Sequence, residues 1–164
     1  MTNRKKFDKI LEIKPQLIDI FSNFSYIHDE GGGRFPNFSL HTVTWAINRS
    51  NILFYIPNED NSVRSFIMLG SESEFCCESR IEMIAGELSD FKVLLKKVKQ
   101  YASSNNTFIL SVFLYRSEEL YNIFKESGFE PIISITDSET GRVNFTKFQI
   151  ILENRDYIVK NINN

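Results

Sequence analysis

Hydrophobic and polar positions alternate most clearly between Ile81 and Phe129, where they predict a strand, a helix, a strand and a second helix. Apolar side chains from 91 to 102 recur at three- and four-residue spacing, which places them on one face of a helix. A nearly continuous apolar run from 107 to 115 then predicts a strand with both faces covered. This stretch is the clearest structural signal in the chain.

Candidate caps mark the ends of both helices. Ser89 and Ser117 each precede a helical pattern and are followed by acidic residues, which favour the positive N-terminus of a helix. Gly128 stands where a left-handed residue would end the second helix. This predicts a Schellman motif in which Phe129 touches Phe124.

The flanking segments predict further strands and an N-terminal helix. Period-two alternation before this stretch predicts strands joined by short polar turns, which favour an antiparallel meander, over 43–47, 52–56, 63–69 and part of 75–85. After the second helix, strands over 131–136 and 143–152 are predicted to form a hairpin. Residues 5–27 are expected to be helical in two parts, with Pro15 opening the second part.

Length and composition indicate one globular domain. The chain has 164 residues, of which 42% are hydrophobic and 24% are charged. We expect a single domain over 1–160 and a frayed tail over 161–164, because this length buries a sufficient core. The 15 phenylalanines predict a core or an interface rich in aromatic area. A formal net charge of −2 gives no overall attraction to nucleic acid.

The sequence predicts no membrane span and no metal site. No apolar run approaches the roughly 20 residues of a transmembrane helix, and the polar N-terminus does not resemble a signal peptide. We expect a cytoplasmic protein. The many Asn, Ile, Lys, Phe and Ser residues are typical of an AT-rich genome, of a phage or a low-GC bacterium, and a phage-encoded protein would lie in the host cytoplasm. The neighbouring Cys76 and Cys77 staple nothing distant, and His28 and His41 lack metal-ligand spacing. The glycines at 31–33 lack the Lys-Ser/Thr of a phosphate-binding loop.

The order of these elements, together with one segment, resembles the GNAT acyltransferase superfamily. In that family the helix after the fifth strand commonly ends in a segment like A-x-x-L-Y-x-K-x-G-F, and here L-Y-N-I-F-K-E-S-G-F runs from Leu120 to Phe129. The resemblance implies an α+β fold with a central mixed, mostly antiparallel twisted sheet of about six to seven strands flanked by helices. It covers most of the chain as an order of elements.

The resemblance also implies a cofactor site. An acyl-CoA, acetyl-CoA or another, would lie where two neighbouring strands separate, with its pyrophosphate on backbone amides that open the following helix. The family carries an Arg/Gln-x-x-Gly-x-Gly/Ala signature there, whereas this loop has one glycine and the carboxylates of Glu87 and Asp90. The loop positions that match are Ala85, Gly86, Glu87, Leu88 and Ser89.

The catalytic residues implied by the resemblance are only partly present. Many members use a tyrosine four residues before the glycine to reprotonate the leaving thiolate, and Phe124 occupies that position here. Tyr121 is the candidate substitute, about 60° away around the helix. Glu82 is the candidate base for the acceptor amine, and Glu78 is the next candidate.

Three hypotheses follow for function. The sequence favours a divergent, catalytically impaired GNAT-like domain that serves as a protein-binding or assembly module, with self-association as a homodimer as one form. The alternative is an acyl-CoA-dependent N-acetyltransferase with an atypical pyrophosphate loop. A nucleic-acid-binding surface on the lysines between 92 and 99 ranks third, because the overall charge is balanced.

Overall fold

The computed structural model describes residues 15–20, 52–70, 78–105, 107–115, 117–136, 138–141 and 143–152. Within these ranges, residues 15–20 are helical. Two longer helices are α3 (Leu88–Ser104) and α4 (Glu118–Glu126). The strands are β1 (Ile52–Pro57), β2 (Val63–Leu69), β3 (Glu78–Ala85), β4 (Ile109–Tyr115), β5 (Glu130–Thr136) and β6 (Val143–Ile151).

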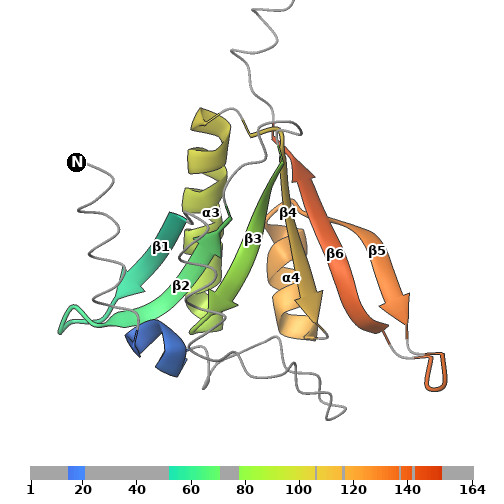
Figure 1. Cartoon of the computed structure of the whole chain (residues 1–164), viewed down its shortest axis with the longest axis horizontal. Coiled ribbons are helices and arrows are strands. Elements are labelled where there is room, and N and C mark those ends of the chain that lie inside the picture. Colours follow the sequence, from blue (N-terminus) through green and yellow to red (C-terminus); the bar gives the residue numbers. More distant parts are fainter. Residues whose placement is uncertain are drawn as a thin grey trace, which may run out of the picture.

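The described strands form one mixed sheet in the order β1-β2-β3-β4-β6-β5 (Figure 1). Four of the five neighbouring pairs are antiparallel, and only β3 and β4 run parallel. The parallel pair arises because α3 carries the chain back across the sheet before β4 begins. The prediction of a mixed, mostly antiparallel sheet flanked by helices is confirmed.

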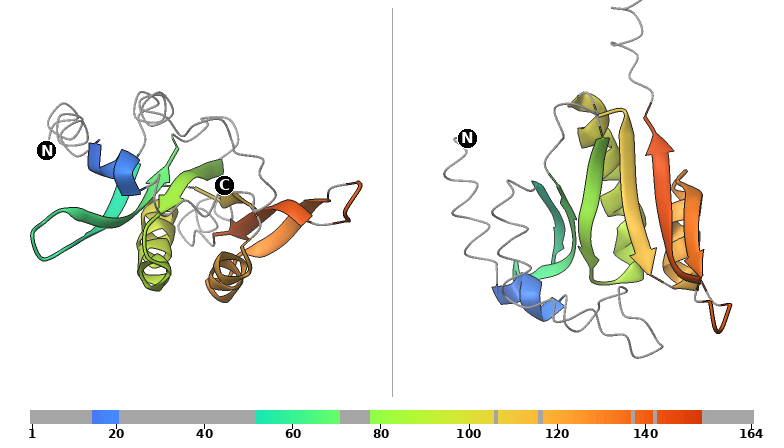
Figure 2. Two further views of the ribbon diagram at one scale, coloured as in Figure 1. Left: turned by 90° about the horizontal axis from the view of Figure 1, so that it is seen from below. Right: turned by 45° about the vertical axis from the view of Figure 1, so that its right-hand side comes forward.

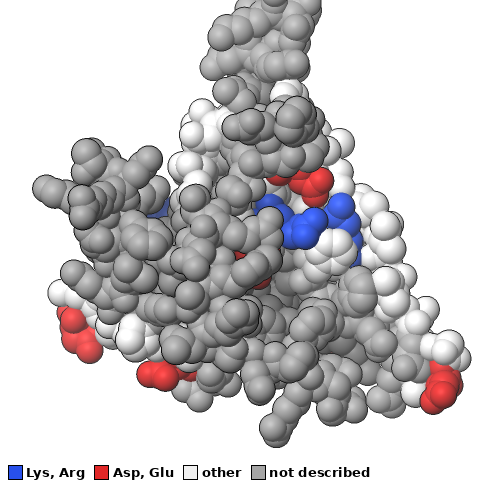
Figure 3. Space-filling model, viewed as in Figure 1, with Lys and Arg blue, Asp and Glu red and all other residues white. Residues whose placement is uncertain are grey.

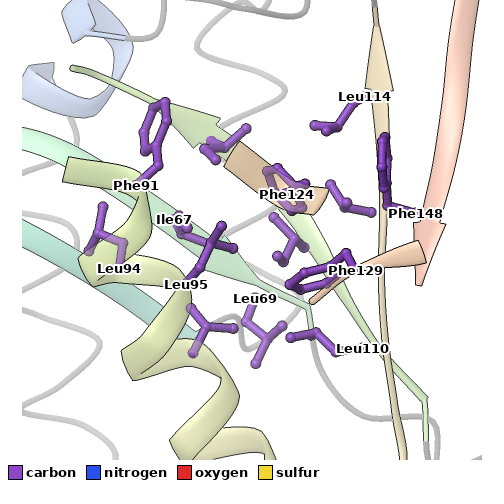
Figure 4. Close-up of a cluster of buried hydrophobic side chains, with 14 of the residues drawn as sticks. Ile67, Leu69, Phe91, Leu94, Leu95, Leu110, Leu114, Phe124, Phe129 and Phe148 are labelled. Atoms are coloured by element: carbon purple, nitrogen blue, oxygen red, sulfur yellow. The ribbon is translucent and has the colours of Figure 1, made fainter. Parts of the chain in front are cut away.

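Helices α3 and α4 lie on the same face of the sheet, and residues 15–20 lie on the other face (Figure 2). The main core fills the space between the sheet and the two helices, where Phe124, Phe129 and Phe148 gather (Figure 4). A smaller cluster on the other face includes Leu17 and Phe66, both fully buried. The sheet face opposite α3 and α4 is called the open face below.

The predicted caps of α4 are confirmed. Ser117 is its N-cap, and the Ser117 side chain accepts a hydrogen bond from the backbone N–H of Leu120. At the other end, Gly128 has a φ of +90° and donates to the Lys125 carbonyl. The N–H of Phe129 donates to the carbonyl of Phe124, and the two rings meet edge to face at 5.0 Å. This is the Schellman motif with its aromatic contact.

Two local predictions were wrong. Ser89 does not cap α3, because the helix begins at Leu88 and its N-cap is Glu87, which makes no side-chain cap bond. The strand predicted over 107–115 begins at Ile109 and is not covered on both faces, since Phe113 is 38% exposed. Burial of the Leu110, Val112 and Leu114 face explains why the strand still forms.

Several predictions fall outside the described residues. They concern most of the N-terminal helix, the strand over 43–47, the glycines at 31–33, the two cysteines, both histidines and the tail over 161–164. Residues 15–20 are helical, and the residue at which this helix begins lies outside the described range, so the role of Pro15 stays a prediction. None of the helices in the described ranges combines the length and the apolar composition that crossing a bilayer requires.

Candidate functional site

Strands β3 and β4 pair only over their first halves. Their parallel ladder holds four residue pairs and ends at the pair Ile81–Val112. Both strands continue beyond it, β3 to Ala85 and β4 to Tyr115, and Figure 1 shows the two arrows diverging toward their arrowheads. Backbone groups on the facing edges are therefore left without a partner among the described strands, which is the separation that the GNAT resemblance implied.

Glu82 lies in a β-bulge just beyond the last pair of that ladder. In the β2–β3 ladder Met68 pairs with Met83 while Leu69 pairs with Ile81, so Glu82 is left without a partner in β2. A bulge bends the strand and redirects the side chain of the extra residue. The bulge therefore places Glu82 outside the regular register of β3 with β2.

The Glu82 side chain lies against the backbone of Gly70. A Cβ atom on Gly70 would meet Glu82 Oε1 at 2.8 Å and Cγ at 3.0 Å. Leu69 faces the core beneath the helices, so Gly70, and with it Glu82, belongs to the open face by strand alternation. Glu82 is half-buried. No described residue donates a hydrogen bond to its carboxylate.

Gly86 brings the loop before α3 into contact with β2. Its φ is +117°, and a Cβ at this position would stand 2.4 Å from both Cα and Oγ of Ser65. Only glycine permits this approach. Ser65 Oγ accepts a hydrogen bond from the Glu87 N–H at 2.8 Å and donates to Asp90 Oδ2 at 2.6 Å. Ser65 therefore fixes the start of α3 on β2.

Asp90 points inward from the first turn of α3 and pairs with Arg64 of β2. Arg64 Nε and Nη2 donate to the two carboxylate oxygens at 2.8 and 2.7 Å. These hydrogen bonds hold the pKa of Asp90 below its ordinary value. Sequence reasoning treated Asp90 as a negative charge standing in the phosphate position. The structure corrects this, because the side chain is 8% exposed and its charge is compensated.

Two backbone amides at the start of α3 have no hydrogen-bond acceptor among the described residues. The amide of Glu87 bonds to Ser65 Oγ, and the amide of Asp90 bonds to the Glu87 carbonyl. Those of Leu88 and Ser89 precede the first intrahelical bond, and no described residue accepts from them. Of the five loop positions predicted to bind a cofactor, these two offer donors at the positive end of a helix.

Tyr121 and Phe124 lie one turn apart on α4 and differ in burial. Phe124 is fully buried, with its ring centroid 5.0 Å from Phe129 and 6.0 Å from Phe148. Tyr121 is half-buried and meets Phe148 edge to face at 4.9 Å. Phe124 is therefore a packing residue. Tyr121 packs at the edge of the core and remains partly accessible to solvent.

The structure does not bring Glu82 and Tyr121 into contact. Glu82 belongs to the open face, whereas Tyr121 packs against the core on the helix-covered face. The separated ends of β3 and β4 lie between these two faces. A reaction that uses both side chains must therefore take place through this separation.

A charged and aromatic cluster on the open face was not predicted as a unit. Glu78 accepts a hydrogen bond from Ser111 Oγ at 2.6 Å and lies 3.6 Å from Lys147 Nζ. The Ser111 bond is the main cause that holds the pKa of Glu78 below its ordinary value. The Arg80 guanidinium and Lys147 Nζ lie 5.3 and 5.7 Å from the centroid of the Phe113 ring. We call these five residues the Phe113 cluster.

The sequence contained part of the signal for this cluster. Alternation on β3 puts residues 78 and 80 on one face, and alternation on β4 does the same for 111 and 113. The register that opposes Arg80 to Ser111 and Phe113 to Lys147 is a long-range property and cannot be read from either strand alone.

No group of three His, Cys, Asp or Glu side chains that would hold a metal ion occurs in the part of the chain that the structure describes. Both cysteines and both histidines lie outside that part.

The sequence matches no protein-family model and no curated protein. Solved structures do match. The ribosomal-protein-S18-alanine N-acetyltransferase from Escherichia coli is 13% identical, with a TM-score of 0.65 over 85% of this chain and 88% of that one. An N-acetyltransferase from Staphylococcus aureus Mu50 is 14% identical, with a TM-score of 0.67 over 87% and 94%. The aminoglycoside 6'-N-acetyltransferase from Enterococcus faecium is 12% identical, with a TM-score of 0.65 over 87% and 92%.

These similarities extend over most of both chains at very low identity, so they establish a shared fold. The six described strands, the parallel β3–β4 pair that separates beyond Val112, and the helices α3 and α4 on one face agree with it. The chain has the GNAT fold, as the sequence resemblance predicted.

Proposed function

We propose that this chain is an acyl-CoA-dependent N-acyltransferase, with acetyl-CoA or another acyl-CoA as donor. The observation that carries the proposal is the early end of the β3–β4 ladder beside the Glu82 bulge. Unpaired strand edges offer backbone donors and acceptors to an extended ligand, much as an added strand would use them. The structural neighbours are N-acetyltransferases, which supports the same function.

The start of α3 suits the phosphate end of such a donor. The amides of Leu88 and Ser89, which donate to no described residue, lie at a positive helix end, where phosphate is favoured. Asp90 does not oppose this, because Arg64 neutralises it. Glu87 is the one exposed carboxylate of this loop. Because its negative charge repels phosphate, we expect weaker phosphate binding than a glycine-rich loop would give.

The chemistry divides between the two sheet faces. Acyl-CoA supplies a thioester as the activated acyl group. The acceptor amine attacks the thioester carbon from the open face and forms the C–N bond while the C–S bond breaks. Glu82 Oε1 takes the proton that the amine loses, and Tyr121 Oη gives a proton to the departing sulfur from the helix-covered face.

The experiment is a turnover assay with two variants and a control. Release of free thiol from acetyl-CoA is followed with a panel of primary amines. Glu82→Gln is expected to lower kcat by about 100-fold or more, the usual contribution of a positioned base. Tyr121→Phe is expected to lower kcat less, because water can protonate a thiolate. Glu59→Gln, an exposed turn residue, is the control and should leave kcat unchanged.

Two outcomes would contradict this assignment. Unchanged kcat in both Glu82→Gln and Tyr121→Phe removes the proposed roles of the two residues. Thiol release that is the same with and without every amine contradicts the acyltransferase itself.

A protein-binding or assembly module on the same fold is the second candidate. Phe124 lacks the hydroxyl that the family uses. In addition, β5 lies at the end of the described strand order, where Ile132, Ile133 and Ile135 are 53%, 55% and 45% exposed. An edge strand with exposed apolar side chains suits a protein partner or a second copy of the chain.

Sedimentation velocity over a range of protein concentrations tests this candidate. Self-association through β5 predicts a dimer that Ile133→Lys dissociates, while the exposed-site control Val93→Lys does not. A monomer at every concentration contradicts self-association.

A further inference from the structure

The Phe113 cluster occupies the open face next to Glu82. Ser111 and Phe113 alternate with core residues of β4, and Lys147 precedes the buried Phe148 on β6, so all three side chains face away from α3 and α4. Figure 3 looks onto this face and shows Lys and Arg atoms gathered over its middle, with Asp and Glu atoms beside them. Arg80 stands two residues before Glu82 on the same strand.

The charges of the cluster leave one cation in excess. Glu78 is held by Ser111 Oγ and is paired with Lys147 at 3.6 Å. Arg80 is exposed and has no ion pair among the described residues. Its guanidinium instead lies over the Phe113 ring at 5.3 Å, a cation–π arrangement that orders the side chain. The open face thus presents an ordered guanidinium that pairs with no carboxylate in the part of the chain that the structure describes.

An ordered guanidinium beside an exposed aromatic ring suits a ligand with a carboxylate and an apolar segment. The guanidinium fork matches a carboxylate in a bidentate arrangement, which gives both orientation and affinity. Phe113, at 38% exposure, offers the apolar contact. Residues 80 and 82 are two positions apart on one strand, so their Cα atoms are about 6.5 Å apart. One small molecule can reach both side chains.

We infer that the acceptor is an amine that also carries a carboxylate. Arg80 binds the carboxylate, Phe113 packs against the segment that joins the two groups, and the amine lies at Glu82. This inference rests on the proposed function for the role of Glu82. The binding of the carboxylate by Arg80 can be measured without turnover.

The test compares acceptors that differ only in their charge. β-Alanine, 4-aminobutyrate and 6-aminohexanoate are each paired with the corresponding amide, so that the carboxylate is replaced by a neutral group of the same shape. Binding is measured by ligand-observed NMR for the wild type, Arg80→Gln, Arg80→Lys and the control Lys96→Gln, an exposed residue of α3. Turnover of the same six amines is measured with acetyl-CoA.

The expected result is a preference of the wild type for at least one acid over its amide. Arg80→Gln should raise the Kd and KM of that acid about tenfold to 100-fold, the usual effect of removing a charged hydrogen-bond partner. The Kd of acetyl-CoA, the KM of the amide and the behaviour of Lys96→Gln should not change. Arg80→Lys should restore part of the preference, since it keeps the charge and loses the fork.

Other outcomes separate this inference from the proposed function. If acetyl-CoA binds but acids and amides are used alike, or Arg80→Gln weakens both alike, the acceptor inference is wrong and the proposed function stands. If the acids bind through Arg80 but acetyl-CoA does not bind, the cluster is an anion site, and both its role as acceptor site and the proposed function are wrong.

Discussion

The carboxylate of Glu82 rests on the backbone of Gly70, so closely that a methyl group at position 70 would stand 2.8 Å from Glu82 Oε1. Gly70 is held in place by its N–H bond to the Arg80 carbonyl at 2.8 Å. The bulge on β3 and the missing side chain on Gly70 together determine where the proposed base lies.

Gly70→Ala is therefore expected to impair turnover with little effect on stability. The atoms nearest to the added methyl group are Oε1, Cγ and Cδ of Glu82, a side chain that can rotate aside, so the free energy of unfolding should change by less than about 1 kcal/mol. Because the carboxylate is displaced, kcat should fall toward that of Glu82→Gln. Urea unfolding and the thiol-release assay measure the two effects. A kcat equal to that of the wild type would show that the position of Glu82 does not matter.

Substitutions of two glycines with positive φ separate steric overlap from backbone strain. Gly86→Ala places its methyl group 2.4 Å from the Ser65 backbone at a φ of +117°, and should destabilise the protein by about 3 kcal/mol or more. Gly141→Ala has a φ of +67° and nothing within 4 Å, so it should cost only about 1 kcal/mol. Equal losses in urea unfolding would contradict the close approach of Gly86 to β2.

The Arg64–Asp90 pair is expected to make stability depend on pH in a defined direction. The pKa of Asp90 is lowered in the folded state by its bonds to Arg64, so its contribution is present above about pH 4 and is lost as pH falls through the lower, folded pKa. Asp90→Asn should reduce the free energy of unfolding at pH 7 by about 1–3 kcal/mol.

The difference between the wild type and Asp90→Asn should shrink in urea unfolding as the pH is lowered below about 4. Glu59→Gln, in an exposed turn, serves as the control and should show no such change. A difference that stays constant as the protein is acidified would mean that the Asp90 charge does not contribute to stability.

Phe124→Tyr tests whether the family's usual acid position is still usable. Phe124 is fully buried beside Phe129 and Phe148, so an added hydroxyl would enter the core without a partner. A loss of about 1–3 kcal/mol of stability and no gain in kcat are expected. A tenfold rise in kcat would instead show that position 124 faces the leaving group, and Tyr121 would lose its proposed role.

Local sequence signals predicted the elements well where one residue determines the geometry. Ser117, Gly128 and Phe129 fixed both ends of α4, since a cap, a left-handed glycine and a ring contact each depend on near neighbours. The prediction that Ser89 caps α3 was wrong because it considered near neighbours alone. Its side chain fits a cap, but Ser65 of β2 already bonds to the backbone before α3, and this partner lies 22 residues away.

The candidate site was less predictable because its geometry depends on pairs that are distant in sequence. Glu82 was found from strand alternation, yet its bulge arises from register with β2. Asp90 was recognised as a carboxylate near the loop, but its neutralisation required Arg64, 26 residues away. The Phe113 cluster draws on three strands, and only the sheet order brings them together.

Calorimetric titration of the protein with acetyl-CoA, paired with thermal unfolding, tests the central claim that the separated ends of β3 and β4 receive an acyl-CoA. The proposal predicts saturable heat at one molecule per chain, and stabilisation by about 2.7 kcal/mol at a ligand concentration 100 times the Kd. Gly70→Ala should bind acetyl-CoA as the wild type does, because it alters only the acceptor side. No heat and no shift in unfolding temperature at millimolar acetyl-CoA would contradict the claim.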